Sequence, residues 1–268
     1  MNSGRSNLTT KSKDCFVRND ILRKIMNWNG TVSLLIACLE FLLLFNLLVF
    51  AEKNRLNKIA IMMVALLAGY QTMEFLMCQV ELQSSFFPYF AFIIISFLPP
   101  LNLSLTSAFT KVSSDKLSSF SYMIFLPAIL FSIYYTFVIP EFAVTSCTVL
   151  YATYHYPLGD LYGFFYYLPI LISIIFLALF VRKESDKMKK LIGKVLLFGA
   201  IFISISPLLG FSLMFAGSYA AISAVESVMC KFAFVYALCL TFVCIYNSPF
   251  KDERNYFKYL SGYKQWNS

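Results

Sequence analysis

The sequence predicts an all-α polytopic membrane protein, a bundle of seven transmembrane helices. The chain has 268 residues, of which 59% are hydrophobic and only 13% are charged, whereas about a quarter of a soluble domain is charged. Seven apolar runs are each long enough to cross a bilayer, which takes about 20 helical residues. None shows the alternation over about ten residues that is typical of membrane β-barrel strands. We place the runs at Thr31–Ala51, Ile59–Val80, Phe86–Phe109, Ser119–Ile139, Leu161–Val181, Leu191–Phe215 and Tyr219–Tyr246.

Two polar segments flank a membrane domain that covers residues 31–246. Residues 1–30 form a polar, basic N-terminal tail, and residues 247–268 form a C-terminal tail that is too short for an output domain. All the basic residues of the N-terminal tail precede Met26. Either Met26 is the biological start, or a basic tail of this length crosses the membrane.

The basic residues indicate the topology of the chain. The net charge of +8 comes from short segments beside the apolar runs, which favours contact with the lipid bilayer and excludes nucleic acid as a partner. Lysine and arginine occur in the loops after the first, third and fifth runs, and are absent from the loops after the second, fourth and sixth. Basic loops stay in the cytoplasm. We therefore expect the N-terminus outside and the C-terminus in the cytoplasm.

A few polar side chains interrupt the apolar runs. An ionisable group in the bilayer costs about 2.5 to 3.5 kcal/mol on insertion scales, so these side chains should face protein and find partners. Each is either a satisfied interhelical hydrogen bond or part of a ligand site. The candidates are Glu40 in the first run, Gln71 and Glu74 on one face of the second, Asn102 after Pro99-Pro100 in the third, and Glu226 and Lys231 in the last.

Lys231 is expected to pair with a carboxylate at its own depth. Counting about 1.5 Å per residue from the outer helix ends places Lys231 and Glu40 at similar depths, and the first and last helices are neighbours in a closed ring. Glu40 is therefore the predicted partner and Glu74 the second choice. Glu226 is expected to be partly hydrated near the outer end of the last helix.

The loop from Pro140 to Asp160 is the largest external segment. Its centre is rich in β-branched residues, which favours an extended lid over the bundle; the alternative is an interfacial loop whose tyrosines lie among headgroups. Cys147 in this loop and Cys78 at the outer end of the second helix both face an oxidising compartment, which predicts a disulfide. Aromatic residues of the neighbouring helix ends, Tyr135 and Tyr162 among them, are interpreted as an interfacial belt.

The sequence offers little for catalysis. Seven cysteines show no metal-ligand spacing, His155 is the only histidine, and no phosphate-binding, dinucleotide or nucleophile-elbow motif occurs. We expect no metal, no cofactor and no enzymatic activity. A lysine in the last helix also suggests a retinal Schiff base, but both tryptophans, Trp28 and Trp266, fall outside the helices.

Several local patterns occur together in a recognisable order. They are Tyr70-Gln71 with Glu74-Phe75, Phe97-Leu-Pro-Pro-Leu101, Cys147, Tyr162-Gly-x-x-Tyr166-Tyr167 and Ser227-Val-Met-Cys-x-Phe-Ala233. With them the chain resembles bacterial seven-helix membrane proteins akin to the sensor regions of some histidine kinases. The resemblance implies a bacterial inner-membrane location and a sensory role. In that family pattern a proline and a glycine stand where this chain has Glu226 and Lys231, so the shared function need not depend on these two residues.

Two functions remain open. A stand-alone sensor or receptor-like bundle without its own output domain would require a separate cytoplasmic signalling partner. A transporter or lipid-handling protein would instead use the intramembrane carboxylates Glu40, Glu74 and Glu226. The absence of an inverted repeat disfavours transport.

Overall fold

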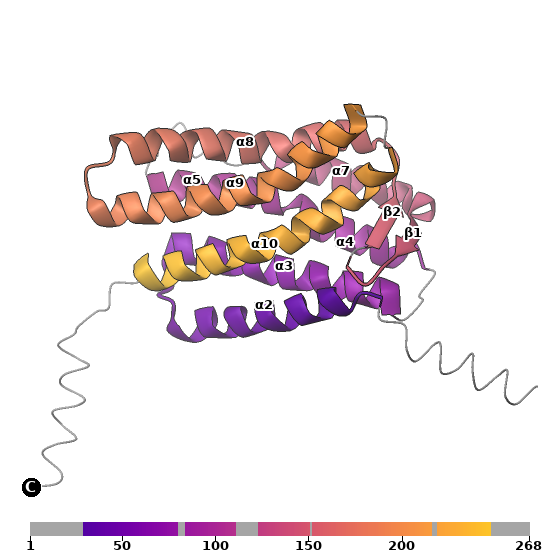
Figure 1. Ribbon diagram of the computed structural model, residues 1–268, viewed down its shortest axis with the longest axis horizontal. Helices are drawn as coiled ribbons and strands as arrows, with labels where there is room; N and C mark the ends of the chain where they lie inside the picture. Colours follow the sequence, from indigo (N-terminus) through magenta and orange to yellow (C-terminus); the bar gives the residue numbers. More distant parts are fainter. Residues whose placement is uncertain (1–28, 80–83, 111–122, 151, 216–218, 248–268) are drawn as a thin grey trace, which may run out of the picture.

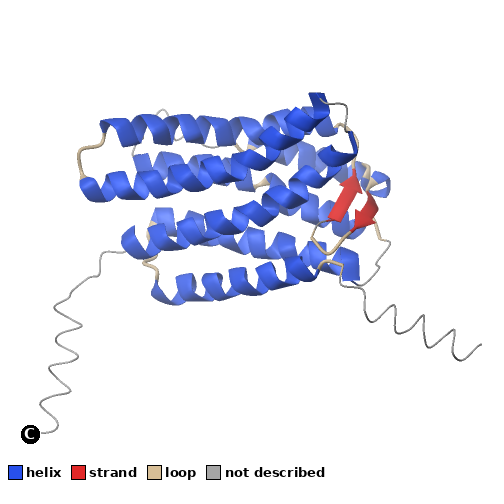
Figure 2. Cartoon of the chain, viewed as in Figure 1, coloured by secondary structure: helices blue, strands red, loops and turns tan. Residues whose placement is uncertain are grey.

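The helices lie side by side and form an elongated bundle (Figures 1 and 2). The computed structural model describes residues 29–79, 84–110, 123–150, 152–215 and 219–247. Its helices are α2 Thr31–Phe50, α3 Arg55–Gln79, α4 Phe86–Ser96, α5 Leu98–Thr110, α7 Leu126–Phe137, α8 Gly159–Lys183, α9 Lys187–Phe215 and α10 Tyr219–Asn247, with a 3₁₀ turn η1 at Ile139–Glu141. Six spans in the described residues are long and apolar enough to cross a membrane, α4 and α5 counting as one. This confirms the predicted all-α membrane helix bundle.

The structure differs from the prediction in the third and fourth helices, each of which was expected to be one uninterrupted span. The third is divided at Phe97 into α4 and α5. Pro99 and Pro100 have no N–H, so the carbonyls of Ile95 and Ser96 lack their helical donors, and the double proline accounts for the interruption. The fourth appears as α7, a shorter apolar helix of 12 residues. The beginning of that predicted run, residues 119–122, lies outside the described residues.

A two-stranded antiparallel hairpin covers one end of the bundle, called here the hairpin end (Figure 1). Its strands are β1 Ala143–Cys147 and β2 Ala152–His155, and β2 packs against α3 and α10. Tyr154 of β2 is buried, which favours the predicted lid over an interfacial loop. The connection between the strands also holds the start of α2, because the Gly30 N–H donates to the Thr148 carbonyl at 2.9 Å.

The predicted disulfide is present. Cys78 near the end of α3 is bonded to Cys147 of β1, with a Cα–Cα distance of 5.5 Å. Gly30 packs against this bond, since a side chain there would place its Cβ 3.1 Å from Cys78 Cβ, and its φ of 73° is one that favours glycine. The disulfide therefore fixes the hairpin to α3 beside the start of α2.

The prediction of an aromatic belt is wrong for the two tyrosines named above. Tyr135 and Tyr162 are buried, and both pack on Phe92, with ring centroids 4.5 and 4.4 Å away. The Tyr135 hydroxyl donates to the Pro157 carbonyl. The folded hairpin segment covers these rings, which periodicity within the helices could not reveal.

α9 and α10 pack closely at Gly199. A Cβ at Gly199 would overlap the ring of Tyr236 and lie 3.3 Å from Cys239 Sγ. Tyr236 is itself buried, and its hydroxyl donates to Asn102, which restricts movement of the ring. By contrast, a Cβ at Gly163 of α8 would meet no atom within 4 Å.

Replacing these two glycines by alanine should therefore give different results. We expect Gly199→Ala to lower the free energy of unfolding by about 1–3 kcal/mol through overpacking. Gly163→Ala should be neutral or stabilise by up to about 1 kcal/mol through helix propensity. Thermal unfolding of both variants in the same detergent measures the difference, and equal losses would contradict the α9–α10 packing.

Candidate functional site

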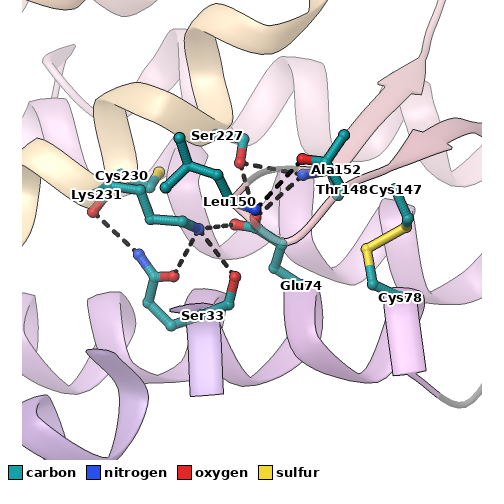
Figure 3. A network of polar contacts seen from close by, with 11 residues as sticks. Ser33, Glu74, Cys78, Cys147, Thr148, Leu150, Ala152, Ser227, Cys230 and Lys231 are labelled. Atoms are coloured by element: carbon teal, nitrogen blue, oxygen red, sulfur yellow. Dashed lines mark hydrogen bonds and ion pairs between the residues drawn. A yellow bond between two sulfur atoms is a disulfide. The ribbon is translucent and has the colours of Figure 1, made fainter. Parts of the chain in front are cut away.

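The carboxylate of Glu74 on α3 is the centre of a buried polar network (Figure 3). Its Oε2 accepts from Lys231 Nζ of α10 at 2.6 Å. Its Oε1 accepts from the Ser227 hydroxyl at 2.7 Å and from the Ala152 N–H at 3.1 Å. Glu74 is fully buried. One carboxylate thus joins α3, α10 and strand β2.

Lys231 uses all three protons of its ammonium group. Besides Glu74, it donates to Gln71 Oε1 at 2.9 Å and to Ser33 Oγ at 3.0 Å. The Gln71 amide is oriented in turn, because its Nε2 donates to the Cys230 carbonyl at 3.0 Å. An ammonium has three donors and no acceptor. The charge is therefore both paired and fully hydrogen-bonded, which is how a lysine can be tolerated in a membrane helix.

The spacing of residues on α3 places this network next to the disulfide. Gln71, Glu74 and Cys78 follow one another at intervals of three and four, so they share one helix face. All three are buried. The sequence prediction of a single polar face is confirmed, and this face meets both α10 and the hairpin.

The prediction that Lys231 pairs chiefly with Glu40 is wrong, and the second choice, Glu74, is the partner. The expected contact of α2 with α10 is present. However, the Lys231 ammonium reaches Ser33, and Glu40 lies seven residues further along α2, which is about 10.5 Å along the axis. The lysine side chain leans toward the start of α10 and so away from Glu40.

The other two acidic candidates are outside this network. Glu40 is fully buried, and neither carboxylate oxygen has a hydrogen-bond partner among the described residues. Glu226 belongs to α10, but its side chain lies outside what the structure describes. Its expected hydration therefore stays a prediction.

Asn102 lies at a small cavity near the double proline. Its Oδ1 accepts from the Tyr236 hydroxyl across the bundle. The cavity has about 40 Å³ of water-accessible space, enough for a few water molecules. Its lining is mostly apolar and consists of Met63, Leu67, Leu98, Pro99, Asn102, Tyr166, Ile170, Ile203, Met229, Cys230, Ala233 and Tyr236.

Sequence reasoning missed several members of these sites, among them Ser227, which donates to Glu74. Ser33 shares a helix face with Glu40, seven residues away, and this spacing could have identified it. Ala152 contributes a backbone N–H, for which no side-chain pattern exists. Tyr236 is one aromatic residue among many in the last run, and only its partner Asn102 distinguishes it.

The arrangement is suited to holding elements together. The Lys231 ammonium is surrounded by acceptors, whereas a lysine nucleophile must be an unprotonated amine, so a Schiff base is disfavoured here. No group of three or more histidine, cysteine, aspartate or glutamate residues that could hold a metal occurs in the described part of the chain. The one positive and one negative charge of the network balance each other.

A double-mutant cycle tests the ion pair. Lys231→Met alone should destabilise the protein by about 3–5 kcal/mol, because it leaves the Glu74 charge buried without its partner. Adding Glu74→Gln should recover much of this loss, since the amide oxygen still accepts from Ala152. The matched control is Lys231→Met with Glu40→Gln, which should recover nothing. Chemical unfolding in mixed micelles gives the coupling energy, and additive losses for the Glu74 pair would disprove the assignment.

Comparison of the chain with protein-family models, with curated proteins and with solved structures finds no match. The resemblance to seven-helix sensor regions therefore stays a prediction from sequence. Function has to be argued from the hairpin, the ion pair and the helices that they connect.

Proposed function

We propose that the chain is a membrane sensor that receives its signal at the hairpin end and passes it to a cytoplasmic signalling partner. The observation that carries the proposal is the Glu74 carboxylate, which binds Ala152 of the hairpin together with Ser227 and Lys231 of α10. Movement of the hairpin must disturb these bonds. The change would then reach a membrane helix directly.

α10 provides a route from one face of the membrane to the other. It runs for 29 residues from the hairpin end to the opposite end of the bundle (Figure 1). It contacts α2, α3 and α9 along the way. A shift of α10 at the ion pair therefore has packed neighbours through which it can alter the opposite end.

The basic residues and the disulfide support an orientation with the hairpin end outside the cell and the opposite end in the cytoplasm. The helix ends and connections opposite the hairpin (Figure 1) carry two basic clusters, which favours a cytoplasmic location for that end. The clusters are Lys53, Arg55 and Lys58, and Arg182, Lys183, Lys187, Lys189 and Lys190. The Cys78–Cys147 disulfide at the hairpin end favours an oxidising exterior. With the resemblance to bacterial sensor regions, a bacterial inner membrane is the proposed location.

Transport is the competing function, and the geometry favours it less. Glu74 is already neutralised by Lys231 and holds three donors. Neither Glu40 nor Glu74 belongs to the residues that line the cavity. A transported cation would have to displace Lys231 before it could reach the Glu74 carboxylate.

Cells lacking the chain, complemented with either wild type or Glu74→Gln, separate the two functions. A sensor predicts a set of transcripts that changes on deletion, is restored by wild type and is not restored by Glu74→Gln. Ser173→Ala is the matched control, because this buried serine donates only within α8, to Pro169. RNA sequencing and metabolite ratios between cells and medium are the measurements. A solute ratio that follows Glu74 without any such transcript set would contradict sensing and support transport.

A further inference from the structure

Glu40 is the buried ionisable group that the proposed function leaves unused. The buried face of α2 consists of Ser33, Ala37, Glu40 and Leu47, while neighbours such as Phe41 and Leu42 are exposed to the surroundings of the bundle. Glu40 therefore points into the bundle, toward the helices α3 and α10 that pack on α2. Its carboxyl group is fully buried there, and no described residue forms a hydrogen bond with it.

An ionised Glu40 carboxylate would have no hydrogen-bond donor among the described residues to offset the loss of its hydration. It would lie within a membrane helix, and burial of an unpaired charge is strongly unfavourable. A protonated carboxyl group carries no charge, so its burial is far less unfavourable. In practice a buried acid of this kind keeps its proton.

The charges around Glu40 lead to the same conclusion. Among the side chains that the structure describes, the ionisable groups of the two packed helices that are buried or nearly so are Glu74 and the Tyr70 phenol on α3, and Lys231, Cys230, Tyr236 and Cys244 on α10. Lys231 is the single cation of this set. Its charge is already balanced by Glu74 at 2.6 Å. An ionised Glu40 would leave the cluster with a net charge of −1.

We propose that Glu40 is a proton-binding site whose occupancy is coupled to the Lys231–Glu74 ion pair. While the pair is intact, Glu40 is a neutral carboxylic acid. When the pair is broken, the O–H bond of the acid breaks and the proton passes to water, because the Glu40 carboxylate then balances the freed ammonium. The ligand of this site is a proton. Movement of the hairpin end that breaks the Lys231–Glu74 ion pair would therefore release the proton from Glu40.

Infrared spectroscopy of the protein in lipid nanodiscs at neutral pH detects this proton directly. The difference spectrum of wild type minus Glu40→Gln should contain one carbonyl stretch of a protonated carboxylic acid. Glu141→Gln is the matched control, because Glu141 is exposed in the 3₁₀ turn η1 and not buried in a membrane helix. The control difference spectrum should contain only carboxylate bands. Absence of an acid band for Glu40 would overturn the proton site, however other variants behave.

The coupling is tested in a Glu74→Gln background. Lys231 has lost its counter-charge there, so the difference between Glu74→Gln and Glu74→Gln/Glu40→Gln should lack the acid band and show a carboxylate band instead. If Glu74→Gln does not accumulate in folded form, Glu74→Asp replaces it, because the shorter side chain draws the carboxylate back from Lys231. In that background the acid band should lose part of its area. An acid band of undiminished area would overturn the coupling while leaving the proton site in place.

Discussion

The Glu74 carboxylate is the interaction on which the hairpin end of this bundle depends. It accepts the charge of Lys231 and, through its other oxygen, the donors of Ser227 and Ala152. In a membrane interior each of these groups would be unfavourable if left alone. Together they satisfy one another, so removing any one of them affects all the others. This shared dependence is why an acid and a base can occupy two transmembrane helices of an otherwise apolar protein.

The hairpin is held by this carboxylate and by a covalent bond on the same face of α3. Cys78 lies four residues after Glu74, one helical turn further along, and bonds Cys147 of β1. The disulfide fixes the position of the hairpin on α3. The hydrogen bond from Ala152 to Glu74 depends on how the hairpin is placed over α10. A covalent attachment beside a hydrogen-bonded one supports the proposed sensor function, since the hydrogen bond can break without loss of the fold.

The sequence was sufficient for the helix bundle, the polar face of α3 and the disulfide, because these follow from residue spacing and from the loops that lack basic residues. It did not predict the division of the third helix at Phe97 or the short fourth helix. The sequence did not identify Glu74 as the first-choice partner of Lys231. Counting residues from the helix ends places Lys231 and Glu40 at similar depths, whereas the Lys231 ammonium lies at Ser33, seven residues before Glu40, and pairs with Glu74. The Ala152 contact uses a backbone N–H, which has no sequence signature. The burial of Tyr135 likewise depends on how the hairpin segment folds back over it.

Hydrogen–deuterium exchange at the Ala152 amide tests the central claim most directly, because this N–H is the contact between the hairpin and the buried ion pair. The Ala152 N–H donates to Glu74 Oε1 and also to Ser227 Oγ at 3.3 Å. In lipid nanodiscs the wild-type amide should exchange slowly, and Glu74→Leu combined with Ser227→Ala, which removes both acceptors, should accelerate it about ten- to hundredfold. The Phe142 amide, which donates to Ile139 in the neighbouring turn, should be unaffected. An Ala152 amide that exchanges in the wild type as fast as an unprotected one would contradict the account.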